Sequence, residues 1–439
     1  MEGFREQKPD KDMETKAIAI VGLNASGKTQ LMEKMRREMK SDRVRYMAFC
    51  DAYGTATDRS YYLQQRWNQH DIDEETPRVG QALERSFLMS GADTPERRNL
   101  QQELYTLMGM DRLLSEYVIA LSSGELRKMQ LVKTLMATPK VLILDNPFIG
   151  LDKEARLQLS QQLAVLKAHG IQLYLVVSRP GDIPDFVDEI IRTTPQQEFM
   201  AAVCTQQTAP PQLAVTSEAS APEVISMNNI TIRYNERTIL KDLSWTVLQG
   251  QRWSLSGRNG SGKSTLLSLI CADNPQAYAC DIRLFGHQRG TGESIWEIKS
   301  RIGYVSPELH RSYRRNLPAL HIVASGLKDT VGLYVHVNET ERKQCLEWMK
   351  RFGIEGLADR SFMQLSSGEQ RMVLVARAFV KNPDLLILDE PMHGLDMQRQ
   401  QLVKDIIEEY CQDSSKTLIM VTHYEEELPL CIDHAMRLG

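Results

Sequence analysis

The sequence has no apolar run long enough to cross a membrane. A membrane-spanning helix needs about 20 predominantly apolar residues, and no stretch of the 439 residues approaches this. The N-terminal segment MEGFREQKPDKDMETK is charged and lacks the apolar core of a secretion signal. We therefore expect a cytoplasmic protein that reaches a membrane only through a partner, peripherally at the inner face of the cell membrane.

Paired cysteines and a strong net charge are also missing. The seven cysteines are scattered and form no CxxC pair, which argues against a zinc site or a disulfide framework. The net charge of −4 is too small to imply a strong field for nucleic acid or anionic membrane. These absences favour an ordinary soluble globular protein in a reducing compartment.

The chain contains an internal repeat. Residues 121–152 read LSSGELRKMQLVKTLMATPKVLILDNPFIGLD, and residues 365–396 read LSSGEQRMVLVARAFVKNPDLLILDEPMHGLD. The two segments align without a gap, as expected of two copies of one domain. Between them, residues 193–224 carry four prolines and no lysine or arginine, a composition typical of a linker. The sequence therefore predicts domains over residues 1–192 and 225–439.

Short apolar strands alternate with helical segments in both halves. This alternation favours an α/β fold in which a mainly parallel sheet is covered on both faces. In the second half, the expected strands are residues 252–256, 385–389 and 417–422, with a helix over residues 264–271. Upstream, residues 224–234 and 238–248 are predicted to pair around a turn at residues 235 and 236.

Two glycine-rich loops match the phosphate-binding pattern GxxxxGK[ST]. The second half has GRNGSGKST at residues 257–265, and the first has GLNASGKT at residues 22–29. Each lies between a strand and a helix, where backbone N–H groups can point at phosphate oxygens, the lysine reaches the phosphates and the next hydroxyl ligates Mg²⁺. The lysine and hydroxyl are Lys263 and Ser264 in the second half, and Lys28 and Thr29 in the first. The other expected nucleotide contacts are Gly257, Asn259, Gly260, Gly262, Thr265, Gly22, Asn24 and Gly27.

A buried strand in each half ends in an aspartate. LLILDE ends at Asp389 and Glu390, and VLILDN ends at Asp145 and Asn146. An aspartate at this strand end can hold Mg²⁺, and Glu390 can polarise the attacking water as a general base. Because asparagine cannot accept a proton from water at neutral pH, we expect poor chemistry in the first half.

These motifs stand in the order found in ATP-binding-cassette (ABC) ATPases, which the chain resembles over nearly its whole length. LSSGE, found twice, resembles the signature LSGGQ, GLD occurs after each aspartate strand, and His423 in VTH resembles the switch histidine. The LSxGE variant, the tandem layout and the lack of membrane spans most resemble the ModF group, named as molybdenum-transport ATP-binding proteins. The resemblance implies hydrolysis of ATP with Mg²⁺.

In the ABC family, two such domains face head to tail and sandwich ATP between the phosphate loop of one and the signature of the other. Carried over here, the resemblance implies intramolecular pairing and two composite sites. Site II combines Lys263, Ser264, Asp389, Glu390 and His423 with Ser122 and Gly124, and its catalytic residues are Glu390, His423 and Lys263. Site I combines Lys28, Thr29 and Asp145 with Ser366 and Gly368. Site I has Asn146 in place of Glu390 and Arg179 in place of His423.

The chain also departs from the family pattern. The aromatic residue that stacks on adenine corresponds to Tyr234 in the second half, but in the first half only residues 1–21 precede the phosphate loop. We therefore expect a single strand there, at residues 17–21, no adenine-stacking strand pair, and weaker nucleotide binding. The Q-loop glutamine, which ligates Mg²⁺ and couples to a membrane partner, is replaced by Pro307 in the second half and falls near Asp51 in the first.

Three functions are compatible with these motifs. The first is an ATP-hydrolysing subunit related to molybdate-type transporters, with a membrane permease as partner. The second is a soluble ABC ATPase acting on a macromolecule; ribosome-binding members have a long charged helical linker, so the linker found here disfavours a ribosome or nucleic acid. The third is a nucleotide sensor, which the intact Glu390 and His423 disfavour. The segments 64–67 and 310–315 are interpreted as solvated surface rather than docking patches.

Overall fold

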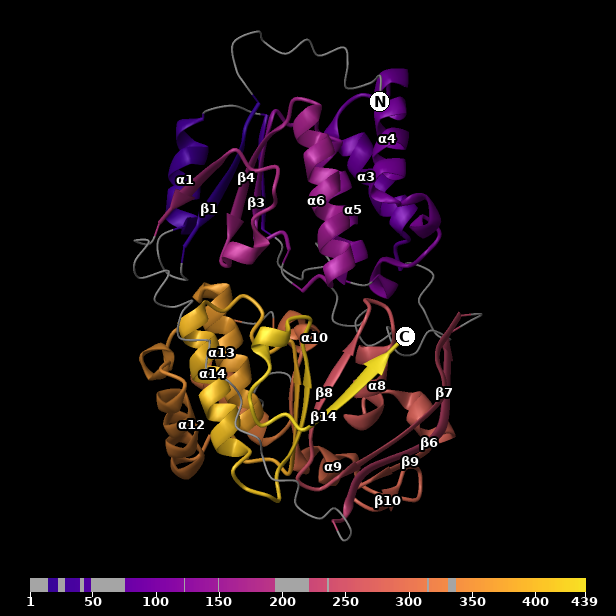
Figure 1. Ribbon diagram of the computed structural model, residues 1–439, viewed down its shortest axis with the longest axis vertical. Helices are drawn as coiled ribbons and strands as arrows, with labels where there is room; N and C mark the ends of the chain where they lie inside the picture. Colours follow the sequence, from indigo (N-terminus) through magenta and orange to yellow (C-terminus); the bar gives the residue numbers. More distant parts are fainter. Residues whose placement is uncertain are drawn as a thin grey trace. The chain divides into compact units, whose positions relative to one another are not determined.

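The computed structural model describes residues 15–22, 28–39, 43–48, 76–121, 123–148, 150–193, 221–234, 237–313, 316–330 and 337–439. These residues form two compact units, one before and one after the segment 194–220. Figure 1 shows both units. Most of the predicted linker lies outside the described residues.

The first unit is built on a five-stranded parallel sheet in the order β2-β3-β4-β1-β5. Its strands are β1 (Ala17–Val21), β2 (Val44–Ala48), β3 (Val141–Asp145), β4 (Gln172–Val177) and β5 (Glu189–Arg192). Its helices are α1 (Lys28–Glu38), α3 (Val79–Ser90), α4 (Pro95–Met108), α5 (Ser123–Leu135) and α6 (Lys153–Ala168). Strand β1 has the predicted bounds. Among the described residues of this unit, no antiparallel strand pair occurs.

Both faces of this sheet are buried, as its continuous apolar strands predict. Because successive side chains of a strand point to opposite faces, Ile18 and Ile20 pack with Met32 of α1, whereas Ala17 and Ala19 pack in the larger core with α3 to α6. Figure 1 shows α1 on one side of the sheet and α5 and α6 on the other.

The second unit has the same parallel sheet and an additional antiparallel one. The parallel sheet runs β11-β12-β13-β8-β14, and the antiparallel sheet runs β10-β9-β6-β7. The strands are β6 (Glu223–Tyr234), β7 (Arg237–Leu248), β8 (Arg252–Gly257), β9 (Asp281–Leu284), β10 (His287–Gln288), β11 (Ile302–Val305), β12 (Leu385–Asp389), β13 (Thr417–Val421) and β14 (His434–Leu438). The strand pair expected upstream of the phosphate loop is β6 and β7, which are antiparallel. Its predicted turn lies outside the described residues.

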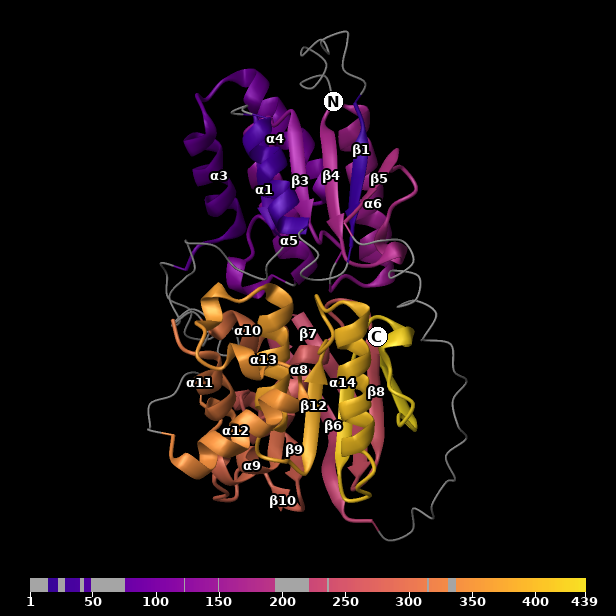
Figure 2. The same ribbon diagram turned by 90° about the vertical axis from the view of Figure 1, so that its left-hand side faces the viewer.

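The helices of the second unit cover both faces of the parallel sheet. They are α8 (Lys263–Ile270), α9 (Ile295–Arg301), α10 (Pro307–Ser312), α11 (Ala319–Ala324), α12 (Glu339–Arg351), α13 (Ser367–Phe379) and α14 (Met397–Tyr410). Residues of α8 share one core with strands of both sheets. The opposite face of the parallel sheet packs with α11 to α14, and Figure 2 shows α11, α12 and α13 grouped beside β12.

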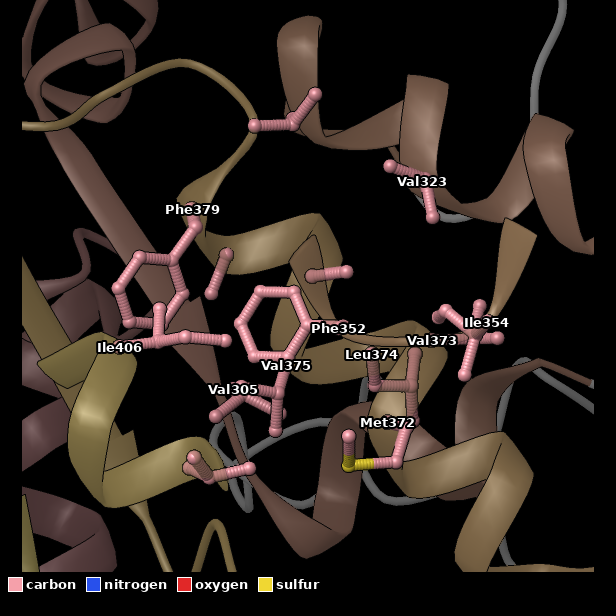
Figure 3. Close-up of a cluster of buried hydrophobic side chains, with 14 of the residues drawn as sticks. Val305, Val323, Phe352, Ile354, Met372, Val373, Leu374, Val375, Phe379 and Ile406 are labelled. Atoms are coloured by element: carbon pink, nitrogen blue, oxygen red, sulfur yellow. The ribbon is translucent and has the colours of Figure 1, made fainter. Parts of the chain in front are cut away.

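An aromatic cluster anchors α13, the helix that follows the second signature. Phe379 lies 5.5 Å from Phe352 and 5.7 Å from Tyr410, measured between ring centroids, and both pairs are edge-on. Figure 3 shows Phe379 and Phe352 among apolar side chains of this core. Nearly every residue of α13 after its first turn is buried. The signature residues at its start are therefore held by the core.

The two parallel sheets have the same topology. Strands β1 to β5 of the first unit correspond in order to β8, β11, β12, β13 and β14 of the second. Each unit thus places its phosphate loop and its aspartate at the carboxyl ends of two parallel strands separated by one strand, which is where α/β sheets bind ligands.

Candidate nucleotide sites

The phosphate loop of the second unit connects β8 to α8. Gly262, the residue before α8, has φ +94°, a left-handed conformation that favours glycine, and a Cβ there would lie 2.7 Å from Leu240 Cδ2. Lys263 donates hydrogen bonds from Nζ to the carbonyl oxygens of Gly257 (2.7 Å) and Arg258 (2.9 Å). The ammonium group is thus folded back over the loop, where phosphate oxygens would lie.

Asp389 ends β12 in a buried position, with 5% of its surface exposed. Burial raises its pKa well above the usual range, and the carboxylates of Glu308 and Glu390 raise it further. A divalent cation would relieve this repulsion, and Mg²⁺ prefers oxygen donors such as carboxylates. The Asp389 carboxylate and the Ser264 hydroxyl therefore provide donors of the kind that Mg²⁺ takes.

Glu390 is held by two strands and two histidines. It has φ +49°, which is uncommon for a residue other than glycine, and its N–H donates to the Val421 carbonyl at 2.9 Å. His423 Nε2 lies 3.2 Å from Glu390 Oε1, and His393 Nδ1 lies 3.2 Å from Oε2. Burial alone would raise the pKa of Glu390, but the two imidazoles hold that pKa well below the usual range. These contacts favour the ionised carboxylate, the form that a general base needs.

The adjacency of strands explains why His423 reaches Glu390. Strands β12 and β13 are paired in parallel with Asp389 opposite Val421, so the residues after each strand end side by side. His423 is expected here from its resemblance to the family motif, whereas His393 was not predicted. The available signal was a histidine three residues after Glu390, in the segment MHGLD.

The first unit has the same backbone at this point but different chemistry. Asn146 has φ +52° and donates its N–H to the Val176 carbonyl at 2.8 Å, as Glu390 does to Val421. Its side-chain amide, however, donates to Asp145 Oδ1 at 2.8 Å and accepts from Ser178 Oγ at 3.2 Å. The difference between the two sites therefore lies in the side chain, and the amide can take no proton from water.

A network of hydrogen bonds extends from Asn146 toward Lys28 on one side and toward Tyr46 on the other. Lys28 is 7% exposed, and its ammonium donates to Ser178 Oγ at 2.9 Å and to the Gly22 carbonyl. On the other side, the Tyr46 hydroxyl donates to Asp145 Oδ2 at 2.8 Å. Burial raises the pKa of Asp145, although Tyr46 and Lys28 oppose this. Both oxygens of the Asp145 carboxylate thus already accept a hydrogen bond from the protein.

The structure describes only some of the remaining predicted nucleotide contacts. Ser366 caps α13 through a hydrogen bond between its hydroxyl and the Glu369 N–H (3.3 Å), Gly368 is buried in the first turn, and Gly124 lies near the start of α5. Tyr234 ends β6, and its hydroxyl accepts a hydrogen bond from Asn274 Nδ2 at 2.9 Å. Asn24, Gly27, Asp51, Ser122 and the Thr29 side chain lie outside the described residues.

Residues 310–315 are interpreted from the sequence as a surface loop, but His310 lies on a helix and is half-buried. Pro307 begins α10, and His310 on that helix lies 2.8 Å from Gln370 Oε1 of α13, measured from Nε2. His310 also contacts the ring of Phe362 edge-on at 6.0 Å. Residues 314 and 315, and the segment 64–67, lie outside the described residues. The helix after the Q-loop position is therefore joined to the signature helix within this unit.

The sequence pattern of the family described as ABC transporter matches residues 13–149 and 240–393, which is more than half of the chain. This chain belongs to the ABC transporter family. Accordingly it is an ABC ATPase, with two ATP-binding domains in tandem, and the fold predicted from the sequence is confirmed. None of the helices in the described part of the chain is both long and apolar enough to span a membrane.

Relatives support the tandem ABC organisation. The ABC transporter ATP-binding protein ModF of Escherichia coli is 36% identical over 452 aligned residues, covering 95% of this chain and 90% of that protein. An ABC transporter ATP-binding protein of Schizosaccharomyces pombe is 31% identical, covering 76% of this chain and 71% of that protein. A solved structure described as a model of ribosome-bound archaeal Pelota and ABCE1 matches 94% of this chain and 71% of its own at a TM-score of 0.59 and 16% identity, a likeness of fold alone.

Proposed function

We propose that this ABC ATPase hydrolyses ATP at site II and holds nucleotide with little turnover at site I. The observation that carries the proposal is the contrast between Glu390, a carboxylate flanked by two imidazoles, and Asn146, which occupies the same backbone position with an amide. In site II, Glu390 takes a proton from the attacking water, His423 positions it, and Lys263 stabilises charge on the phosphates. Magnesium at Ser264 and Asp389 would neutralise phosphate charge.

We propose that the signatures complete these sites as in the family. Ser122 and Gly124 would then face the nucleotide held by Lys263, and Ser366 and Gly368 the nucleotide held by Lys28. The support within one unit is that Ser366 and Gly368 begin a helix whose following turns are buried. A helix start fixed in this way can present backbone N–H groups to phosphate.

The proposed cellular role is that of an ATP-binding subunit for a membrane permease. The likeness to ModF supports this role, and action on a macromolecule such as the ribosome is the alternative. To separate them, tagged protein with Glu390→Gln, which we expect to retain ATP, would be isolated with ATP from membrane and ribosome fractions of its host. Co-purification of one permease would support the proposal, and ATP-dependent retention on ribosomes would overturn it.

Lys263→Ala should weaken ATP binding and remove ATPase activity, whereas Lys28→Ala should leave one tight site. Both lysines already donate two hydrogen bonds within their own domains, so the expected difference comes from Tyr234, which the second domain offers for adenine stacking. Stacking of a base on an aromatic side chain is worth about 1–3 kcal/mol, so we expect about 10-fold weaker binding in Lys263→Ala than in Lys28→Ala. Titration of each variant with labelled ATP measures this difference.

Tyr234→Ala combined with Lys28→Ala is the control for the stacking contribution. It should bring the remaining site close to the affinity of the Lys263→Ala protein. Equal affinities in the two single lysine variants would show that the sites bind ATP alike, and the assigned difference between them would be wrong.

A further inference from the structure

Glu390, the proposed general base, lies beside a second imidazole that the family motifs do not account for. His393 stands in the loop between β12 and α14, three residues after Glu390. Its ring nitrogen Nδ1 lies 3.2 Å from Glu390 Oε2, while His423 Nε2 lies at the same distance from the other oxygen. Both histidine side chains and Glu390 are largely buried, with exposed fractions of 12%, 6% and 16%. The carboxylate is thus held from two directions by side chains from two different loops.

We propose that His393 is a second positioning residue for the ATPase reaction, fixing Glu390 Oε2 as His423 fixes Oε1. This inference rests on the proposed function of site II. The terminal torsion of a glutamate side chain is broad, so a single partner leaves the plane of the carboxylate free to turn. An imidazole nitrogen 3.2 Å from each oxygen restricts that plane. A carboxylate has about four acceptor positions, so both oxygens keep an acceptor position for the attacking water.

The backbone at Glu390 explains why such support is needed. Its φ of +49° is uncommon for a side chain of this size, and such conformations persist only where surrounding contacts determine them. One contact is the N–H of Glu390 to Val421, and another is the N–H of His393 donating to the Glu390 carbonyl at 3.1 Å. This turn requires no side chain at position 393, so the imidazole contact is an additional feature.

A comparison within the chain supports the same assignment. The sheet register corrects one predicted equivalence: Asp389 lies opposite Val421 and Asp145 opposite Val176, so Ser178 and not Arg179 stands at the position of His423. Glu390, His393 and His423 therefore correspond to Asn146, Ile149 and Ser178 of the first domain. The base and both of its imidazole partners are therefore replaced together, whereas Asp389 is matched by Asp145. This joint replacement is expected if the three residues act as a group.

The test compares His393→Ala and His393→Asn with the unchanged protein. We expect His393→Ala to lower the kcat of ATP hydrolysis about 10-fold, within the range that misplacement of a reacting group costs, with KM for ATP changed less than about twofold. Asparagine places an N–H donor near the position of Nδ1, so His393→Asn should recover most of the lost kcat. Steady-state ATPase kinetics and thermal unfolding would be measured for each variant.

The outcomes distinguish this proposal from the assignment of site II. If His393 serves only the turn, its backbone hydrogen bond persists in His393→Ala and kcat stays unchanged. An unchanged kcat in His393→Ala, together with an inactive Glu390→Gln protein, would therefore overturn the positioning role and leave the assignment of site II intact. If Glu390→Gln itself kept its activity, the proposed site II would be wrong. If His393→Ala lowers both the thermal stability and kcat, His393→Asn separates the two effects. Recovery of the thermal stability without recovery of kcat in His393→Asn would overturn the positioning role.

Discussion

Glu390→Gln is expected to lower the ATPase rate about 10²–10⁴-fold, the usual contribution of a general base. Glutamine has nearly the same shape, but its amide cannot take a proton from water. Lys263 and the phosphate loop are unchanged in this variant, so ATP should still bind. Steady-state ATPase assays and titration with labelled ATP would measure the two effects separately.

Asn146→Gln in the first domain is the matched control. It alters the equivalent backbone position, where φ is +52° compared with +49° at Glu390, but it removes no base. We therefore expect the ATPase rate of this control to stay within about a factor of three of the unchanged protein, since both residues lack proton-accepting capacity. An active Glu390→Gln protein, or an inactive Asn146→Gln protein, would contradict the assignment of catalysis to site II.

Ser122→Arg should block hydrolysis, although Ser122 lies in the first domain and Glu390 in the second. If the signature of one domain completes the site of the other, arginine at this position displaces donors to the γ-phosphate. Preorganised donors of this kind are worth about 10²–10³-fold in rate. Ser366→Arg would alter the proposed site I, where we expect little chemistry, and should cost much less. Comparison of steady-state ATPase rates of the two variants tests this asymmetry.

The structural role of Ser366 requires a separate control. Its hydroxyl caps α13, and loss of an N-cap costs about 1 kcal/mol of stability. Ser366→Asp retains capping ability, so thermal unfolding of both Ser366 variants would separate the cap from the nucleotide contact. If domain closure needs ATP in both sites, Ser366→Arg will also slow turnover through the shared interface. A greater loss in Ser366→Arg than in Ser122→Arg would mean that pairing is between molecules or that site I is catalytic.

The elements around both sites follow from the sequence because their patterns are local. A strand buried on both faces reads as a continuous apolar run, so β1 and β12 have the bounds that the sequence predicts. Strands β8 and β13 differ from prediction by one residue at one end, and helix α8 by one residue at each end. The glycine spacing of the phosphate loops and the repeated LSSGE segments likewise identify the ABC family from consecutive residues alone.

The tertiary structure decided which residues contact the side chains that we propose to react. Tyr46 donates to Asp145 across 99 positions of sequence because β2 and β3 are neighbours in the sheet. Lys28 meets Ser178 because β1 lies beside β4. His393 follows Glu390 closely in sequence, yet its contact depends on a left-handed backbone at Glu390, which no residue pattern predicts for a glutamate. The sequence by itself identified the residues that we propose to carry the chemistry. The order of the strands, which brings distant chain segments together, decided what each one contacts.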